Sequence, residues 1–132
     1  MRDSGFGLFL TTISLVSFGY RYGLPPDADL VFDVRFLPNP HFIPHLAKFS
    51  GQDPKVKRYI RSFPQTLEFI ARISDLLIYL LPHYIGEGKS YLTIAFGCTG
   101  GHHRSVMITH EIRKRLAAAG FRLKETHRDV KK

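Results

Sequence analysis

The stretch "YLTIAFGCTGGHHRSVMITHEIRKRL", residues 91–116, contains an apolar run, a glycine-containing loop and a helical pattern in that order. The run at 90–96 has few charges and many β-branched and aromatic residues, which predicts a central strand. Residues 105–119 repeat apolar side chains at helical spacing and end at Gly120, which predicts a helix. A strand that leads into a helix through a short loop indicates an α/β fold.

The residues before this unit predict two further strands. Residues 11–20 alternate and are rich in β-branched and aromatic side chains, and residues 30–36 repeat that character. Between them, 21–29 form a proline- and glycine-rich loop. Residues 37–44 contain three prolines, which remove backbone donors and exclude regular structure there.

Two helices and a last strand complete the prediction. A short helix is expected from Lys55 to Arg61. Ser62 then has the sequence context of an N-cap, and a second, long apolar helical pattern follows until Pro82 interrupts it. Residues 121–128 alternate and are expected to form a strand. We therefore expect residues 1–132 to form one small single-domain α/β sandwich with a mixed or parallel four-stranded sheet.

The overall composition is that of a globular chain with 44% hydrophobic residues. Its only cysteine, Cys98, excludes an internal disulfide and fits a reducing compartment. The apolar stretch at 8–16 is interrupted by Thr and Ser and is too short to span a bilayer. We therefore expect a cytoplasmic protein with no membrane partner.

Positive charge is concentrated near the C-terminus. The formal net charge is +8, and residues 102–132 have nine basic and three acidic side chains. Such a segment suits a polyanion such as nucleic acid. A solvated helix face with a basic tail would give the same count.

The loop after the central strand has the pattern of an anion site. Cys98 is followed by five residues and then Arg104 and Ser105, with two consecutive glycines between them. Backbone N–H groups of such a loop converge on an anion at a helix N-terminus, and Arg104 offers a planar fork for two oxygens. Thr99 and Ser105 add hydroxyl groups. The loop is therefore predicted to be a phosphate-type loop.

The same spacing occurs in cysteine phosphatases, where a thiolate attacks phosphorus and the arginine holds the equatorial oxygens. This alternative assigns Cys98 as nucleophile and Arg104 as phosphate clamp. Gly97, however, stands where those enzymes usually have a histidine. The sequence also places no acid for the leaving group; the candidates are Asp27, Asp33 and Asp129.

The histidines of the loop predict no metal centre. His102 and His103 are adjacent, so they point to different sides, and no fourth ligand has zinc-type spacing. His103, next to Arg104, is expected to donate to the bound anion instead. His41 lies in a rigid Asn-Pro-His turn after a strand and is also expected to face the ligand.

Four motifs in this order, "SFGYRYGLP", "DVRFLPNPHF", "SYLTIAFGCTGGHHRSV" and "HRD", resemble the C-terminal domain of the RapZ (YvcJ) family. The resemblance extends from about residue 11 to the end of the chain. Members of that family usually join an N-terminal P-loop domain to this one. This sequence has no Walker-type motif and resembles the C-terminal domain standing alone, so P-loop nucleotide hydrolysis is not expected of it.

The resemblance implies an RNA-binding domain with an RNase-adapter role, in which a regulatory RNA is presented to a ribonuclease in the control of amino-sugar synthesis. It also implies a phosphorylated metabolite, for example an amino-sugar phosphate, or sulfate or phosphate in the loop, without another cofactor. A ribonuclease, a separate P-loop protein and a second copy of the chain are the further partners expected.

The residues expected to hold the anion are Arg21, His41, Cys98, Thr99, Gly100, Gly101, His103, Arg104 and Ser105. Asp33, Arg35 and Asn39 match family motif positions, and Arg21 stands where the family commonly has lysine. The basic C-terminal third supplies the expected RNA contacts, namely Arg113, Lys114, Arg122, Lys124, Arg128 and Lys131.

Three hypotheses follow from the sequence. The first is a non-catalytic regulatory domain that binds RNA and a phosphorylated metabolite. The second is a cysteine-dependent phosphatase. The third is a plain interaction domain whose loop holds only structural anions.

Overall fold

The computed structural model describes residues 11–132, so the first part of the apolar stretch at 8–16 lies outside it. Four strands form one sheet, in which every adjacent pair is parallel and the order is β2-β3-β1-β4. The strands are β1 (Thr12–Gly19), β2 (Leu30–Asp33), β3 (Tyr91–Cys98) and β4 (Leu123–His127). The expected α/β fold is confirmed, its sheet is entirely parallel, and β3 is central as predicted.

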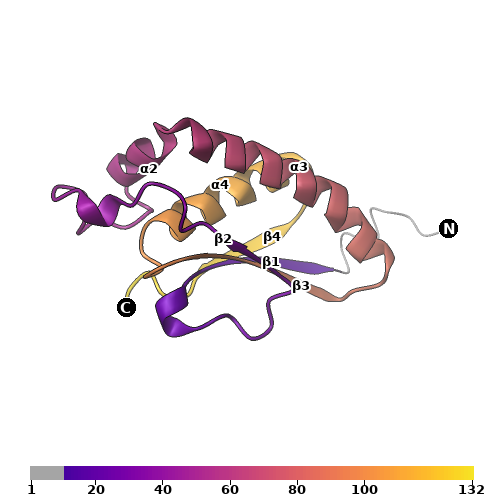
Figure 1. Cartoon of the computed structure of the whole chain (residues 1–132). Helices are drawn as coiled ribbons and strands as arrows, with labels where there is room; N and C mark the ends of the chain where they lie inside the picture. The colour runs from indigo at the N-terminus through magenta and orange to yellow at the C-terminus, as the bar shows by residue number, and fades with distance from the viewer. Residues whose placement is uncertain (1–10) are drawn as a thin grey trace.

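Three α-helices lie on one side of this sheet (Figure 1). They are α2 (Pro54–Arg61), α3 (Pro64–Gly86) and α4 (Arg104–Ala118). The short 3-10 helix η1 (Tyr20–Tyr22) and the loop after it lie on the opposite side (Figure 1). A second 3-10 turn, η2 (Pro40–Phe42), precedes α2.

The core lies between the sheet and the helices. Side chains alternate along a strand, so Ile13 and Leu15 of β1 face the helices and are buried. Helices α3 and α4 each contribute one apolar stripe to the same layer. The fully buried side chains of this layer include Ile13, Leu15, Ile70, Leu77, Leu81, Leu92, Ile94, Phe96, Ile108, Ile112 and Leu116.

The predicted helix at Lys55 to Arg61 is confirmed, but two predicted boundaries are wrong. Strand β2 ends at Asp33 rather than at 36, because the chain turns there and the Asp33 carboxylate accepts a hydrogen bond from Arg35 N at 2.9 Å. Ser62 does not cap α3. Its hydroxyl donates to Tyr59 O at 2.6 Å, at the end of α2, and Phe63 is the N-cap without a side-chain hydrogen bond.

Helix α3 also continues through Pro82 to Gly86, contrary to the prediction that Pro82 ends it. A proline removes one intrahelical hydrogen bond, here the one to Ile78 O. Pro82 and Ile78 are both exposed, so the lost hydrogen bond lies on the solvent-exposed side of the helix. Beyond the proline, Leu81 and Ile85 remain on the buried stripe, and their burial favours continuation of the helix.

The loop after β3 packs against the end of β1 without room for side chains. Gly101 has a φ of 79°, and a Cβ there would lie 2.7 Å from Gly19 N and 2.9 Å from the Asp129 Cβ. A Cβ at Gly19 would lie 2.4 Å from the carbonyl carbon of Gly100. Backbone therefore contacts backbone between β1 and the loop, which fixes the position of the loop.

Replacing Gly101 with alanine is expected to destabilise the fold by about 2 to 4 kcal/mol, because a left-handed φ and a steric clash both oppose the new methyl group. Gly120→Ala is the matched control, since its φ is 102° but nothing lies within 4 Å of a Cβ there. Urea unfolding of both variants separates the two costs. Equal losses in the two variants would contradict the tight packing at Gly101.

Candidate functional site

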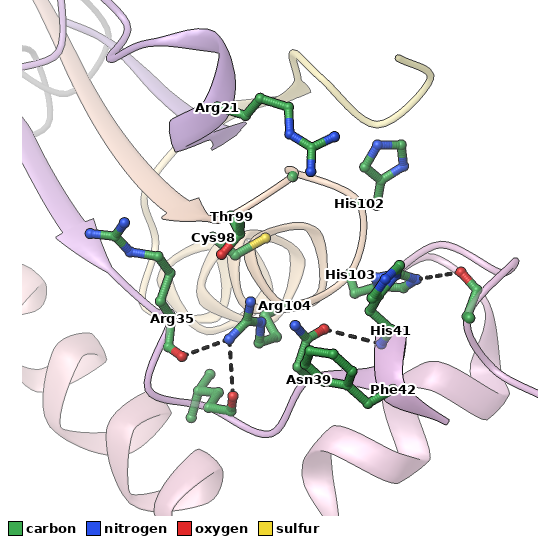
Figure 2. Close-up of a pocket in the computed structure, with 13 residues that line it drawn as sticks. Arg21, Arg35, Asn39, His41, Phe42, Cys98, Thr99, His102, His103 and Arg104 are labelled. Atoms are coloured by element: carbon green, nitrogen blue, oxygen red, sulfur yellow. Dashed lines mark hydrogen bonds between the residues drawn. The ribbon is translucent and has the colours of Figure 1, made fainter. Parts of the chain in front are cut away.

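A pocket of about 670 Å³ lies between the loop after β3 and the segment after β2 (Figure 2). The loop side consists of Cys98, Thr99, Gly100, His102, His103 and Arg104, and the facing side of Arg21, Arg35, Leu37, Asn39, His41, Phe42 and Ala47. Besides Arg104, five of these thirteen residues are arginine or histidine. The pocket is therefore rich in groups that favour an anion.

The parallel sheet explains why these distant residues meet. The carboxyl ends of parallel strands lie at one edge of the sheet, which is where ligands bind in open α/β folds. Arg21 follows β1 and its N–H donates to Thr99 O at 3.1 Å. Val34 follows β2 and its N–H donates to Gly97 O at 2.9 Å. Both following segments are thus hydrogen-bonded to the end of β3.

Arg104 is the buried cation of the pocket. Its side chain is attached to the segment after β2, because Nη1 donates to Arg35 O at 2.6 Å and to Leu37 O at 3.2 Å. Only 5% of the residue is exposed, and its Nε is buried with no hydrogen-bond acceptor among residues 11–132. No carboxylate in this part of the chain forms an ion pair with it. Buried charges normally have such a partner.

The charge of Arg104 persists in this setting. Burial lowers its pKa, whereas the neighbouring Cys98 and Asp33 raise it. An arginine pKa is so high that the lowered value still leaves the guanidinium protonated at neutral pH. The wall of the pocket therefore contains a full positive charge that forms no ion pair with residues 11–132.

Arg35 contributes its carbonyl to this arrangement rather than its charge. Its guanidinium forms a two-point contact with Asp33, at 3.0 and 2.7 Å, and stacks over the Tyr20 ring at 3.9 Å. Figure 2 shows this guanidinium directed away from Arg104, whereas that of Arg21 is directed toward the loop. Arg21 is exposed and forms no ion pair among the described residues, so it remains available to a ligand.

His103 is bound to the segment that closes the pocket. Its Nε2 lies 3.1 Å from Ala47 O, and because a carbonyl only accepts, Nε2 donates in this contact. Burial lowers the pKa of His103, so the ring is neutral at pH 7. Gly51 N donates to His102 O at 2.7 Å beside it. The donor of His103 is thus engaged, and its predicted donation to an anion stays a prediction.

Gly101 and Ser105 lie behind the pocket wall, not on its surface. Gly101 is packed against Gly19, as described above, and the buried Ser105 hydroxyl lies 3.1 Å from Cys98 Sγ. The other seven predicted anion-site residues all line the pocket. Leu37, Phe42, Ala47 and His102 also line the pocket but were not predicted from the sequence. Phe42 follows the predicted His41, and His102 lies between the predicted Gly101 and His103, whereas Leu37 and Ala47 had no such neighbour.

Asp129 of the "HRD" motif supports the loop from the opposite side. Its buried carboxylate accepts from Gly19 N at 2.7 Å and from Arg128 Nη2 at 2.9 Å, and pairs with Lys132 Nζ at 2.8 Å. Burial alone would raise the pKa of Asp129, but these hydrogen bonds lower it to about 2. An ionised Asp129 therefore ties the C-terminal residues to the end of β1, next to Gly101.

The sign of this pKa shift predicts acid sensitivity. Because the pKa of Asp129 is about 2 in the folded chain and near 3.8 otherwise, its contribution to stability is complete above pH 4 and falls as the pH drops toward 2. Asp129→Asn removes that contribution, so its free energy of unfolding should be lower at neutral pH and flatter between about pH 4 and 2. Chemical unfolding across this range tests it, and parallel pH profiles for both proteins would contradict it.

The residues predicted to contact RNA differ in whether carboxylates of the domain engage them. Arg113 pairs with Glu125 of β4 at 2.8 Å, and Arg128 is engaged by Asp129. Lys114 lies on another side of α4, 3.7 Å from Glu111. Arg122, Lys124 and Lys131 are exposed. Three of the six residues are therefore engaged by carboxylates of the domain, and the prediction for each residue stays open.

Two features of the structure weigh against the phosphatase alternative. A Cβ at Gly97 would lie 2.4 Å from the Phe18 ring, so the position has no room for a histidine. Hydrogen bonds from Arg35 lower the pKa of Asp33 despite partial burial, and that of Asp129 is also lowered. Both carboxylates are thus ionised at neutral pH, whereas a general acid needs a raised pKa.

Other site chemistries are also limited. Among residues 11–132, no three metal-ligating side chains gather in one place. No helix in this part of the chain is long and apolar enough to cross a bilayer. The fold and the site thus define a small parallel α/β domain with a cationic pocket at the carboxyl edge of its sheet.

Residues 11–131 match the family model described as the RapZ C-terminal domain. The chain belongs to this family. It is 70% identical over 120 residues to a nucleotide-binding protein of Koribacter versatilis and 68% identical over 120 residues to one of Solibacter usitatus. A nucleotide-binding protein of Geobacter metallireducens is 56% identical over 121 residues. These matches cover 91 to 92% of this chain but only 38 to 42% of each relative, about two fifths of their length.

Proposed function

We propose that this domain is a non-catalytic regulatory module that binds a phosphorylated small molecule in the pocket around Arg104 and binds RNA through its basic surface. The observation that carries the pocket assignment is Arg104. It is a charged side chain, 5% exposed, with no carboxylate partner and an unsatisfied Nε among the described residues. A bound dianion would supply the missing negative charge.

The surroundings of Arg104 suit a phosphate group. The pocket adjoins the first turn of α4, where free backbone N–H groups and the helix dipole favour negative charge. Arg21 lies on the opposite side with its guanidinium directed toward the loop (Figure 2). A phosphate held between these two arginines would have cations on two sides.

The size of the pocket favours a larger ligand than phosphate alone. About 670 Å³ lies within the usual range for small-molecule sites. Asn39, His41 and Thr99 line it and offer polar groups to hydroxyl or amino substituents. A hexose or hexosamine phosphate has this combination of one dianion and several hydroxyl groups, so it is the ligand class that we propose.

The proposed RNA binding is supported by the positive net charge of the chain and by its family. The net charge of +8 favours a polyanionic partner. An adapter role, with a ribonuclease or a separate P-loop protein as partner and with self-association, follows from the family resemblance. If RNA and metabolite contact overlapping residues, each weakens the binding of the other by the same factor.

Calorimetric titration tests the pocket. A hexosamine phosphate should bind wild type, whereas the same hexosamine without phosphate should bind far more weakly. Arg104→Ala should lose roughly tenfold to a hundredfold in affinity, the effect of one charge-assisted hydrogen-bond pair. Arg104→Lys, which keeps the charge but not the fork, should retain part of it.

Arg72→Ala is the matched control, because Arg72 is exposed on α3 and pairs only with Glu68, at 2.8 Å. Wild-type affinity is expected for it. If Arg104→Ala binds the sugar phosphate as tightly as wild type, the pocket assignment is wrong.

Turnover of an aryl phosphate should not exceed background, because the lowered pKa values of Asp33 and Asp129 leave both carboxylates ionised at neutral pH. Cys98→Ser should leave that background unchanged. Measurable turnover that disappears in Cys98→Ser would instead establish the cysteine-phosphatase mechanism.

A further inference from the structure

A second concentration of positive charge lies away from the pocket, where α2 meets α4. Helix α2 has the sequence "PKVKRYIR", which contains four basic residues and no acidic one. Its buried side chains are Val56 and Ile60, so the basic residues occupy its remaining faces. We define the α2–α4 strip as Lys57, Arg58, Arg61, Lys114 and Arg115.

The carboxylate of Glu111 links the two helices and is covered by two basic side chains. Glu111 of α4 forms an ion pair with Arg61 of α2, and Lys114 lies 3.7 Å from its other oxygen. The Glu111 side chain is only 10% exposed, whereas those of Arg61 and Lys114 are 43% and 59% exposed. The negative charge is therefore covered, and the side facing solvent is cationic.

The strip keeps an excess of charge after this pairing. Lys57, Arg58 and Arg115 form no ion pair with residues 11–132. Arg61, Glu111, Lys114 and Arg115 line a shallow cleft of about 460 Å³. No residue of the cleft belongs to the pocket around Arg104. This surface is thus a separate cationic site, with one carboxylate against five cations.

We infer that the α2–α4 strip binds the phosphate backbone of RNA. This inference deepens the RNA half of the proposed function and does not depend on the metabolite pocket. Several cations along two adjoining helices match a partner with regularly spaced phosphates, and three of the five are arginines, whose planar fork suits phosphate oxygens. A free small anion would need only one or two of them.

The absence of exposed apolar side chains argues against a membrane as the partner. Basic helices that bind membranes insert large apolar residues beside their cations. Among the described residues, none of the exposed large hydrophobic side chains belongs to α2 or α4. The strip also offers no exposed aromatic ring for base stacking, so it is expected to contact the backbone independently of sequence.

The test is binding of a short RNA duplex without terminal phosphates, measured over a series of salt concentrations. Because the duplex has no terminal phosphate, it does not present the dianion expected in the pocket. The variant Arg58→Gln/Arg115→Gln changes two exposed residues without ion pairs among residues 11–132. It should bind roughly tenfold or more weakly near about 0.1 M salt, with a salt slope reduced by about 2.

The matched control is Lys48→Gln/Arg72→Gln, which removes the same charge from exposed positions outside the strip and outside the residues predicted to contact RNA. It should retain nearly wild-type affinity and slope, and Arg104→Ala should also bind the duplex normally. Circular dichroism melts of the strip variant and of the control pair should match wild type, since their changed side chains are exposed.

Three results would overturn the inference. If the strip variant binds like wild type while the control pair is weakened, RNA binding stands but its surface lies elsewhere. If wild type does not bind the duplex, the RNA half of the proposed function fails as well, whereas the sugar-phosphate titration still decides the pocket. Strip-dependent binding to vesicles of anionic lipid without RNA binding would identify a membrane partner instead.

Discussion

The structure of the site depends on the hydrogen bonds from Arg104 to the carbonyls of Arg35 and Leu37. They fasten the first residue of α4 to the segment after β2, and that segment forms one wall of the pocket. The guanidinium is buried and charged. Without a nearby anion its burial costs folding free energy, and a bound anion would offset that cost. The carboxyl end of β3, the loop after it and the N-terminus of α4 all meet at this pocket.

The loop is held from its other side by an independent set of contacts. Asp129 binds Gly19 N, and Gly101 packs against the same residue with no space for a side chain. The carboxylate of Asp129 is ionised because Arg128 and Lys132 outweigh its burial. The contacts with Gly19 and Asp129 thus fix the loop on the side opposite the pocket. This arrangement preorganises the N–H groups of the loop for a ligand. The C-terminal "HRD" motif has a structural role at this point.

The sequence predicted most of this architecture because its signals were local. Alternating strands, the strand-to-helix unit and the glycine loop each depend on neighbouring residues, and they appear where expected. Pro82 misled the prediction because the burial of Ile85 is a tertiary effect. Ser62 misled it because its hydroxyl donates back to Tyr59 O in the last turn of α2 instead of capping α3. The engagement of His103 with Ala47 is likewise a contact between distant segments that no spacing reveals.

The basic residues illustrate the same dependence on tertiary contacts. A count by segments placed the basic surface in the C-terminal third, whereas ion pairs with Glu125 and Asp129 occupy Arg113 and Arg128 there. The basic residues of α2 were visible in the sequence, but their meeting with α4 depends on the fold. For the pocket, the loop residues were predictable from the local strand-loop-helix pattern, whereas Arg21 was expected from the family resemblance. The fold brings these segments together because parallel strands end at one edge.

The most direct test of the central claim is the nuclear magnetic resonance signal of the Arg104 Nε–H group during titration with a hexosamine phosphate. This atom has no acceptor among residues 11–132. A bound phosphate should shift its resonance in a saturable manner, and the hexosamine without phosphate should not. An unchanged Arg104 signal at concentrations that saturate binding elsewhere on the chain would contradict the assignment of this pocket as a phosphate site.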